Sequence, residues 1–308
     1  MIVYKELETV TRELGISAHM LYSVSNNLSA HYKKVAIKKR DGGIRNLRVP
    51  DECLKHIQRR INEVFLTQMT VSRYATAYKY GASLRSNASP HIGKNKVLKL
   101  DITGFFDSIL YSQVKEYAFP EWKYSEEIRV LLSILCYFAE RLPQGAPTSP
   151  MVSNIIMYNF DEELGAWCEE RGIAYTRYCD DMTFSGDFDE NDVIKKVSPE
   201  LKKYGFFINS KKTGCYKKGS RQTVTGIVVN DGLSVPSEYR RQIRKEVYYI
   251  KRFGLDAHLK RTGAEVNAEQ YLRSLLGRIS YVLSVNSFDR EMMSCRDQIR
   301  TLLKERTL

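Results

Sequence analysis

The sequence lacks the long apolar runs, cysteine pairs and leader pattern that mark several classes of protein. The longest nearly unbroken apolar run, residues 130–139, includes Ser133 and is too short to span a bilayer. The six cysteines form no C-x-x-C pair, which argues against a zinc ribbon or disulfide framework and fits a reducing cytoplasm. Residues 1–10 contain no cleavable apolar core, so we expect no secretory signal. These absences favour a globular cytoplasmic protein without a membrane partner.

Charge is distributed unevenly along the 308 residues. The whole chain carries 48 Lys and Arg against 36 Asp and Glu, a net charge of +12. Residues 100–192 hold 18 acidic and 6 basic residues, a net of −12, so the remainder carries +24. This pattern suits a metal-dependent enzyme acting on a polyanion, with carboxylates on the cations and basic side chains on the phosphates. By charge alone, solvated faces that keep the protein soluble explain the pattern better.

Apolar periodicity and turn residues predict alternating helices and short strands. Helices are expected within 4–28 (two, the second capped by Ser17) and at 50–68, 84–92, 111–118, 124–139, 149–170, 189–204, 236–253, 267–285 and 288–305. Strands are expected at 35–40 and 44–49, which flank a turn at 41–43, at 96–101, and at 173–178 and 182–185. Short strands are expected to fill residues 206–235. Residues 144–147 are expected to form a loop.

Three aspartates fall at the ends of apolar strands. Asp101 ends the strand predicted at 96–101, and Asp180 and Asp181 occupy the tip of the second predicted hairpin. Carboxylates held at strand ends repel one another, and divalent cations relieve that repulsion most simply. Two magnesium ions bridged by them would activate an attacking hydroxyl and stabilise a leaving pyrophosphate. For the adjacent pair taken alone, an Asp-rich turn without any metal is the alternative.

Four short motifs follow one another along the chain. They are KLDITGFFD at 99–107, LPQGAPTSP at 142–150, YCDD at 178–181 and GFFINSKKT at 205–213. In this order they resemble four motifs of the reverse transcriptase family: its first aspartate motif, its L-P-Q-G block, its Y-x-D-D signature and its G-x-x-x-N-x-x-K-T block. The resemblance spans about residues 37–231 and, more weakly, the helical C-terminus.

The resemblance implies an α+β fold of the right-hand polymerase type. Such a fold has fingers, a palm with an antiparallel sheet flanked by helices, and a helical thumb. On this sequence the N-terminal helices and fingers would cover residues 1–95 and the palm, interleaved with the fingers, residues 96–235. A helical, RNA-binding thumb would cover residues 236–308.

Three further elements resemble bacterial retron reverse transcriptases. They are NASPH at 87–91, similar to an N-A-x-x-H element, VTG at 224–226, and LRSLLGRISYVLSVN at 272–286, similar to the retron thumb. Cys179 stands where alanine is usual in that family. The resemblance implies an RNA-directed DNA polymerase that binds a cognate structured noncoding RNA. It would prime from the 2′-hydroxyl of a guanosine in that RNA and copy part of it, from dNTPs, into branched msDNA.

Retrons act in anti-phage defence, usually with an effector. We expect that effector to be a separate protein, because the sequence shows no appended effector domain. Two other functions compete with the retron interpretation. A group II intron-like or other bacterial reverse transcriptase is disfavoured by the N-A-x-x-H and V-T-G elements and the lack of a maturase or endonuclease domain. A catalytically inactive RNA-binding scaffold is disfavoured by the intact aspartates and L-P-Q-G block.

The resemblance also implies roles in the chemical step. Two Mg²⁺ ions would be held by Asp101, Asp180 and Asp181, with the backbone carbonyl of Ile102 as an additional ligand. Lys212 matches a lysine proposed to protonate the leaving pyrophosphate. A general electrostatic contribution of Lys212 is the alternative.

A second group would bind the incoming dNTP. Arg45 matches an arginine at the triphosphate, where its guanidinium suits phosphate oxygens. Phe106 matches a steric gate whose ring leaves no room for a ribose 2′-hydroxyl, and Gln144 and Gly145 match residues beside the nucleotide. Either Lys38 or Lys39 would make a second phosphate contact, or both are solvated hairpin lysines.

RNA contacts are expected in two regions. Asn87 and His91 would contact RNA or support such a contact, with a purely structural histidine as the alternative. The predicted thumb interleaves basic and aromatic residues, which suits phosphates and unpaired bases, although an amphipathic helix with an aromatic stripe in the core fits too. Its candidate RNA-binding residues are Arg240, Arg241, Arg244 and Lys245.

Overall fold

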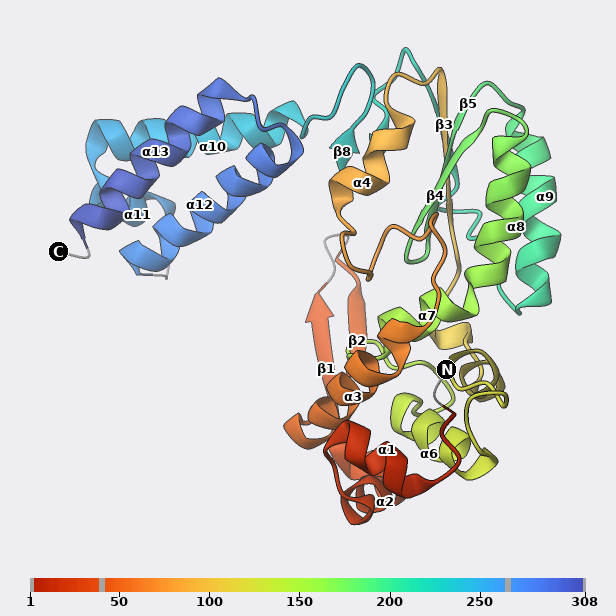
Figure 1. Ribbon diagram of the computed structural model, residues 1–308. Helices are drawn as coiled ribbons and strands as arrows, with labels where there is room; N and C mark the ends of the chain where they lie inside the picture. Colours follow the sequence, from red (N-terminus) through yellow and green to blue (C-terminus); the bar gives the residue numbers. More distant parts are fainter. Residues whose placement is uncertain (1–2, 39–41, 264–266, 307–308) are drawn as a thin grey trace. The chain divides into compact units, whose positions relative to one another are not determined.

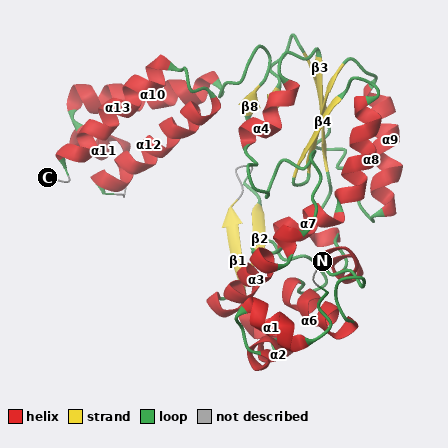
Figure 2. Cartoon of the chain, viewed as in Figure 1, coloured by secondary structure: helices red, strands yellow, loops and turns green. Residues whose placement is uncertain are grey.

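The computed structural model describes residues 3–38, 42–263 and 267–306, without the side chain of Arg45. The chain forms two compact units, one of Met1–Ala82 with Leu98–Cys215 and one of Ser83–Val97 with Tyr216–Leu308. Helices and short strands occur in both (Figures 1 and 2). This division by compactness does not test the region boundaries predicted at 95/96 and 235/236, which stay predictions.

The first unit begins with helices beside a β-hairpin. Ser17 accepts a hydrogen bond from the Met20 backbone N–H at 3.3 Å, and Asp51 accepts one from Leu54 at 2.9 Å, so both residues act as helix N-caps. Strands β1 (Tyr32–Lys38) and β2 (Ile44–Pro50) pair antiparallel. The predicted cap and hairpin are therefore confirmed, while residues 39–41 of the turn lie outside the described residues. The helices of this part are α1 Leu7–Leu14, α2 Ala18–Asn26, α3 Glu52–Val64 and α6 Glu126–Cys136.

A four-stranded sheet follows, in the order β4-β5-β3-β6. Its strands are β3 Lys96–Asp101, β4 Ala174–Tyr178, β5 Asp181–Gly186 and β6 Gly214–Lys217. β4 and β5 form the predicted antiparallel hairpin, in which Tyr178 lies opposite Asp181. Helices α8 (Tyr158–Glu169) and α9 (Glu190–Lys203) lie side by side against the sheet (Figure 1). Because β3 and β5 are neighbours, the end of β3 lies next to the β4–β5 turn.

The prediction of one helix over residues 149–170 is wrong. The segment forms α7 (Ser149–Ile156) and α8, which are separated at Met157, where ψ is 2° instead of about −42°. α7 is buried along almost its whole length, whereas α8 buries only one face. A change of direction at Met157 lets each helix bury its own apolar surface. The local sequence NIIMYNF contains neither glycine nor proline and so carries no sign of the break.

Three smaller predictions are also corrected. The helix expected at 111–118 is a short α5 (Tyr111–Gln113) followed by a π-helical turn, Val114–Ala118. Among the described residues, regular strands within 206–235 are limited to β6, β7 (Thr223–Val224) and β8 (Ile227–Val228). Helix α11 (Leu255–Thr262), which lies between Gly254 and Gly263, was not predicted.

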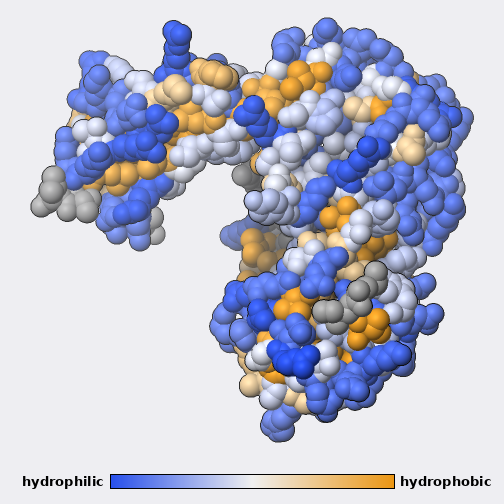
Figure 3. All heavy atoms as spheres, in the orientation of Figure 1, coloured by the Kyte–Doolittle hydropathy of each residue, from blue (hydrophilic) through white to orange (hydrophobic). Residues whose placement is uncertain are grey.

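The second unit has its own apolar core. Helix α10 (Ser237–Phe253) buries Ile243, Val247 and Ile250 at helical spacing, and α12 (Ala268–Val285) buries Leu272 and Ile279 in the same way. On the face shown in Figure 3, apolar residues gather between these helices and hydrophilic residues cover their outer sides. Among the described helices, none is long and apolar enough to cross a membrane. The remaining helices are α4 Leu84–Ala88 and α13 Arg290–Glu305.

His91 is fully buried in the 3-10 turn Ser89–His91 that follows α4. Burial, with a smaller contribution from the charge of Lys94, lowers the pKa of His91 to about 3. The folded protein therefore keeps a neutral imidazole at a pH where the unfolded chain binds a proton.

We expect Gly165→Ala to destabilise the protein although alanine is the better helix former. A Cβ at Gly165 would lie 2.0 Å from Cε2 of Tyr74, whose ring is buried and cannot move aside. Overpacking should lower the free energy of unfolding by about 1–3 kcal/mol, which outweighs a gain of up to about 1 kcal/mol in helix propensity. Thermal unfolding measures the change.

Gly277→Ala is the matched control. A Cβ at Gly277, in the middle of α12, would meet nothing within 4 Å. This substitution should raise stability by about 0.5–1 kcal/mol. Equal effects of the two substitutions would contradict the close packing of Gly165 on Tyr74.

The stability of the protein should fall as the pH falls, because His91 takes up a proton in the unfolded chain before it does so in the folded chain. Between an unfolded pKa of about 6.5 and the folded pKa of about 3, the unfolded chain binds one more proton than the folded chain. The free energy of unfolding should therefore lose up to about 1.4 kcal/mol per pH unit as pH falls through this window, beyond what other groups contribute. His91→Gln should lower stability at pH 7 but reduce the slope in denaturant melts between pH 7 and pH 5. An unchanged slope would refute this explanation.

Candidate active site

A cleft of about 630 Å³ in the first unit brings the three predicted aspartates together. Asp101 reaches it from the end of β3, Asp180 from the β4–β5 turn, and Asp181 from the first position of β5. Because β3 and β5 are neighbours in the sheet, the fold rather than sequence proximity causes this convergence. The other predicted site residues that line the cleft are Ile102, Phe106, Gln144 and Lys212.

Asp101 is held rigidly at the end of its strand. Its side chain is nearly buried, with Oδ2 accepting a hydrogen bond from Lys212 Nζ at 2.8 Å and Oδ1 accepting one from Asn209 Nδ2 at 3.2 Å. The Asn209 backbone N–H also donates to the Asp101 carbonyl at 2.7 Å. The hydrogen bond from Lys212, together with the charge of Asp101, raises the pKa of Lys212, so the ammonium stays charged.

The turn that carries the other two aspartates has an unusual backbone. Cys179 has φ 62°, in the left-handed region that residues with a side chain rarely adopt. The Asp180 carbonyl accepts a hydrogen bond from the Ile102 backbone N–H at 3.0 Å, which ties the turn to the end of β3. Burial by the walls of the cleft, followed by the charges of Asp180 and Asp101, raises the pKa of Asp181 to about 6 although the side chain itself reaches solvent.

The donor set fits divalent cations. Carboxylate oxygens are the ligands that Mg²⁺ prefers. Burial is the largest cause of the raised pKa of Asp181, and the charges of Asp180 and Asp101, which add to it, are charges that a cation would offset. The described residues contain no group of three His, Cys, Asp or Glu already arranged around a metal position. Instead, the Lys212 ammonium neutralises part of the charge at Asp101. A cation bound at Asp101 would therefore compete with Lys212.

The predicted nucleotide-binding residues are distributed around this cleft. Phe106 is half-buried and lines it. The neighbouring Phe105, which is 2% exposed, also borders the cleft but belongs to the apolar core. Gln144 lines the cleft, and its carbonyl accepts a hydrogen bond from the Arg48 backbone N–H of β2 at 3.2 Å. Gly145 has φ 114°, and a Cβ there would lie 3.3 Å from the Arg48 carbonyl. Glycine at 145 is thus required for close approach to β2.

The fingers-like hairpin is described only in part. Arg45 lies on β2, opposite Ile37 of β1, and Ile44 and Asn46 on either side of it line the cleft. The side chain of Arg45 lies outside the described part of the chain. Lys38 is exposed at the end of β1, and Lys39 also lies outside the described residues. The choice between Lys38 and Lys39 stays open.

Asn87 and His91 do not belong to the cleft lining. Their side chains are 1% and 0% exposed. Asn87 Nδ2 donates a hydrogen bond to Thr225 Oγ1 at 3.2 Å, which joins the N-A-x-x-H and V-T-G elements within the second unit. This burial favours a scaffold role over a direct RNA contact.

The four basic residues predicted to bind RNA fall into two pairs. Arg240 lies 2.9 Å from Asp289, and Arg244 forms an ion pair with Glu291 at 3.1 Å. Arg241 and Lys245 are exposed, and neither has an ion pair within the described ranges. These two residues are therefore the better placed to meet an outside polyanion.

Three residues near the β4–β5 turn were missed by the sequence predictions. Asn209, which donates to Asp101, is the asparagine of the G-x-x-x-N-x-x-K-T block. Its place in this motif could have indicated a role in the site. Tyr78, which lines the cleft with φ 59°, has no such signal because only the fold brings it to Cys179. Arg177 precedes the YCDD motif by one residue and is fully buried, which its charge does not suggest.

Comparisons with known proteins agree with this geometry. A family model described as reverse transcriptase (RNA-dependent DNA polymerase) matches residues 37–229, more than half of the chain. The retron Mx65 reverse transcriptase of Myxococcus xanthus is 31% identical over 324 aligned residues, covering 97% of this chain and 72% of the relative. The retron Ec83 reverse transcriptase of Escherichia coli is 33% identical, covering 81% of this chain and 82% of the relative.

Among solved structures, an apo telomerase from Candida tropicalis, truncated from its C-terminal domain, has a TM-score of 0.48 at 16% identity. The likeness covers 67% of this chain and 55% of that one. The retron relatives are much more similar, and they extend over most of both sequences. The chain therefore belongs to the reverse transcriptase family as a retron-type RNA-directed DNA polymerase with the right-hand polymerase fold.

Proposed function

We propose that this retron reverse transcriptase binds a cognate structured noncoding RNA, primes DNA synthesis from the 2′-hydroxyl of a guanosine in it, and makes branched msDNA. The product would act in anti-phage defence together with a separate effector protein. The observation that carries the catalytic part is the convergence of Asp101, Asp180 and Asp181 in one cleft with Lys212. The retron relatives support the remaining parts.

In this proposal Asp101, Asp180 and Asp181 hold two Mg²⁺ ions, with the carbonyl of Ile102 as a further ligand. The ions, when bound, supply activation of the attacking hydroxyl and stabilisation of the leaving pyrophosphate. Lys212, whose ammonium lies 2.8 Å from Asp101, would meet the negative charge that develops on the pyrophosphate, by proton donation or by electrostatic attraction.

The nucleotide would lie along the wall formed by Phe106 and Gln144. A half-buried ring that lines the cleft can exclude a ribose 2′-hydroxyl by contact, which selects dNTPs. Arg45 of β2 would bind the triphosphate, and Gly145 would keep the backbone of the L-P-Q-G block close to β2. The assignments of Phe106 and Gln144 rest on motif positions together with the lining of the cleft, and those of Arg45 and Gly145 rest on motif positions.

RNA binding would depend on the exposed basic residues of α10. Arg241 and Lys245 would contact the phosphate backbone, while Arg240 and Arg244 would keep the helices in register through Asp289 and Glu291. Asn87, through its hydrogen bond to Thr225, and the buried His91 would support the RNA site from within.

The double substitution Asp180→Asn plus Asp181→Asn should abolish metal-dependent dNTP incorporation. The loss should be roughly a thousandfold or more, because several kcal/mol of charge stabilisation by the metals would disappear. RNA binding, measured by filter retention or gel shift, should persist, since neither residue lies among the proposed RNA contacts. Incorporation that survives in the folded variant would overturn the catalytic assignment.

Glu169→Gln plus Glu170→Gln provides a control with the same change in net charge. These adjacent carboxylates lie exposed at the end of α8, and neither lines the cleft. This variant should incorporate dNTPs at the rate of the unmodified protein. A comparable loss would mean that net charge, rather than the cleft, causes the effect.

Expression together with the native flanking locus should yield protein bound to a short DNA. The 5′ end of that DNA should remain joined to RNA until a debranching enzyme cleaves the 2′ linkage, as shown by a mobility shift on denaturing gels. The Asp180→Asn plus Asp181→Asn variant should retain RNA without DNA. Only linear cDNA from the active protein would refute priming from a 2′-hydroxyl.

A further inference from the structure

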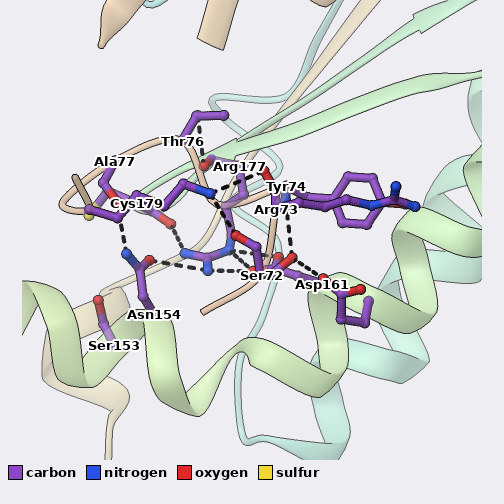
Figure 4. A network of polar contacts seen from close by, with 12 residues as sticks. Ser72, Arg73, Tyr74, Thr76, Ala77, Ser153, Asn154, Asp161, Arg177 and Cys179 are labelled. Carbon is purple, nitrogen blue, oxygen red and sulfur yellow. Dashed lines mark hydrogen bonds and ion pairs between the residues drawn. The ribbon is translucent and has the colours of Figure 1, made fainter. Parts of the chain in front are cut away.

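Arg177 is a fully buried charged residue directly beneath the catalytic turn. It lies on β4, and both its side chain and that of Asp161 on α8 are 0% exposed. Nε donates to Asp161 Oδ1 at 2.8 Å and Nη2 donates to Oδ2 at 2.5 Å, so the pair is bidentate (Figure 4). The Tyr175 hydroxyl also donates to Asp161 Oδ1, at 2.9 Å. Both oxygens of the Asp161 carboxylate therefore accept hydrogen bonds, and the bidentate contact fixes the plane of the guanidinium.

The remaining donors of Arg177 point to the turn and to α7. Nη1 donates to the Cys179 carbonyl at 2.9 Å, and Nη2 reaches Asn154 Oδ1 at 3.3 Å (Figure 4). The Cys179 carbonyl belongs to the peptide that leads into Asp180, and Cys179 is the residue with φ 62°. A left-handed residue with a side chain persists only where its surroundings hold it, and this hydrogen bond does so.

The same arginine connects the turn to another wall of the cleft. Asn154 Nδ2 donates to the Ala77 carbonyl at 2.8 Å, next to Tyr78, which lines the cleft. The Thr76 backbone N–H donates to the Arg177 carbonyl at 2.8 Å, and the Arg177 N–H donates to the Tyr74 carbonyl at the same distance. One residue thus links the turn to α7, to α8 and to the segment that carries Tyr78.

Stability alone is a poor explanation for this arrangement. The desolvation of both charges costs much of the free energy that their attraction contributes. Apolar residues of similar size often stabilise a core equally well. What apolar residues lack is a hydrogen bond to the Cys179 carbonyl. A lysine also could not replace the arginine, because its ammonium cannot reach Asp161, Asn154 and the turn in one planar arrangement.

We propose that Arg177, with Asp161 as its counter-ion, is a positioning residue that holds the Cys179–Asp180 peptide in the conformation that presents both turn aspartates to divalent cations. The inference rests on the proposed role of Asp180 and Asp181 in metal binding. Arg177 touches neither substrate nor metal in this scheme, and it acts only through the turn.

The test is dNTP incorporation by Arg177→Lys as a function of Mg²⁺ concentration, with thermal unfolding to establish the folded fraction. Loss of the turn hydrogen bond should raise the metal concentration for half-maximal activity, and lower the rate, by about 10–100-fold, as is typical when groups that orient metal ligands are removed. A folded variant with the metal curve and rate of the unmodified protein would overturn the proposal.

Rescue gives a second readout that a purely structural role would not produce. Glycine adopts the left-handed conformation without steric cost, so Cys179→Gly should restore part of the activity lost in Arg177→Lys. Activity that stays at the Arg177→Lys level in the folded double variant would count against the positioning role.

Two further variants keep the test decisive. If Arg177→Lys does not fold, Arg177→Met plus Asp161→Leu replaces the buried pair by apolar residues and should show the same rise in metal requirement. Tyr175→Phe removes one hydrogen bond to Asp161 but leaves Arg177 on the turn, so it should lower the melting temperature without moving the metal curve. A shift of the metal curve in Tyr175→Phe as large as in the Arg177 variants would contradict the proposal.

Failure of this inference and failure of the proposed function give different results. Metal-dependent incorporation by the unmodified protein, together with its loss in Asp180→Asn plus Asp181→Asn, establishes the function independently of Arg177. Arg177 variants that match the unmodified protein would then refute the positioning role alone.

Discussion

The mutual repulsion of three carboxylates in one cleft is the constraint on which the rest of the site depends. The walls of the cleft limit the access of water, so solvent does not fully screen this repulsion. Burial, followed by the charges of Asp180 and Asp101, raises the pKa of Asp181 to about 6. Asp101 is fixed by Asn209 and Lys212, so it cannot swing away from the turn. The negative potential of the clustered carboxylates, which disfavours their ionisation, also attracts the divalent cations that a polymerase site requires.

Holding such a turn in place requires polar groups inside the core. Ile102 binds the turn from β3, and Arg177 binds it from β4. The Arg177–Asp161 pair shows how a protein can place a full charge in its interior when each of the three guanidinium nitrogens has an acceptor within reach. Because desolvation of the two charges offsets much of their attraction, the pair contributes more to holding the turn in one conformation than to the stability of the fold.

The basic excess of the chain has more than one use. Lys212 neutralises part of the acidic site, and Arg240 and Arg244 neutralise acidic residues of α13. Arg241 and Lys245 remain exposed to solvent. The count of 48 Lys and Arg therefore overstates the number of basic side chains that are available to nucleic acid. The ion pairs of the structure identify which basic residues are already engaged within the protein.

The sequence by itself determined the family, the order of the motifs, the strand that ends at Asp101 and the hairpin with Asp180 and Asp181 at its tip, because these depend on local patterns. Tertiary structure alone decided the rest. It broke the helix at Met157, buried His91, and joined Arg177 to Asp161 across β4 and α8. Burial and ion pairing depend on which elements pack together, and no local pattern records the partner that lies far away in the sequence.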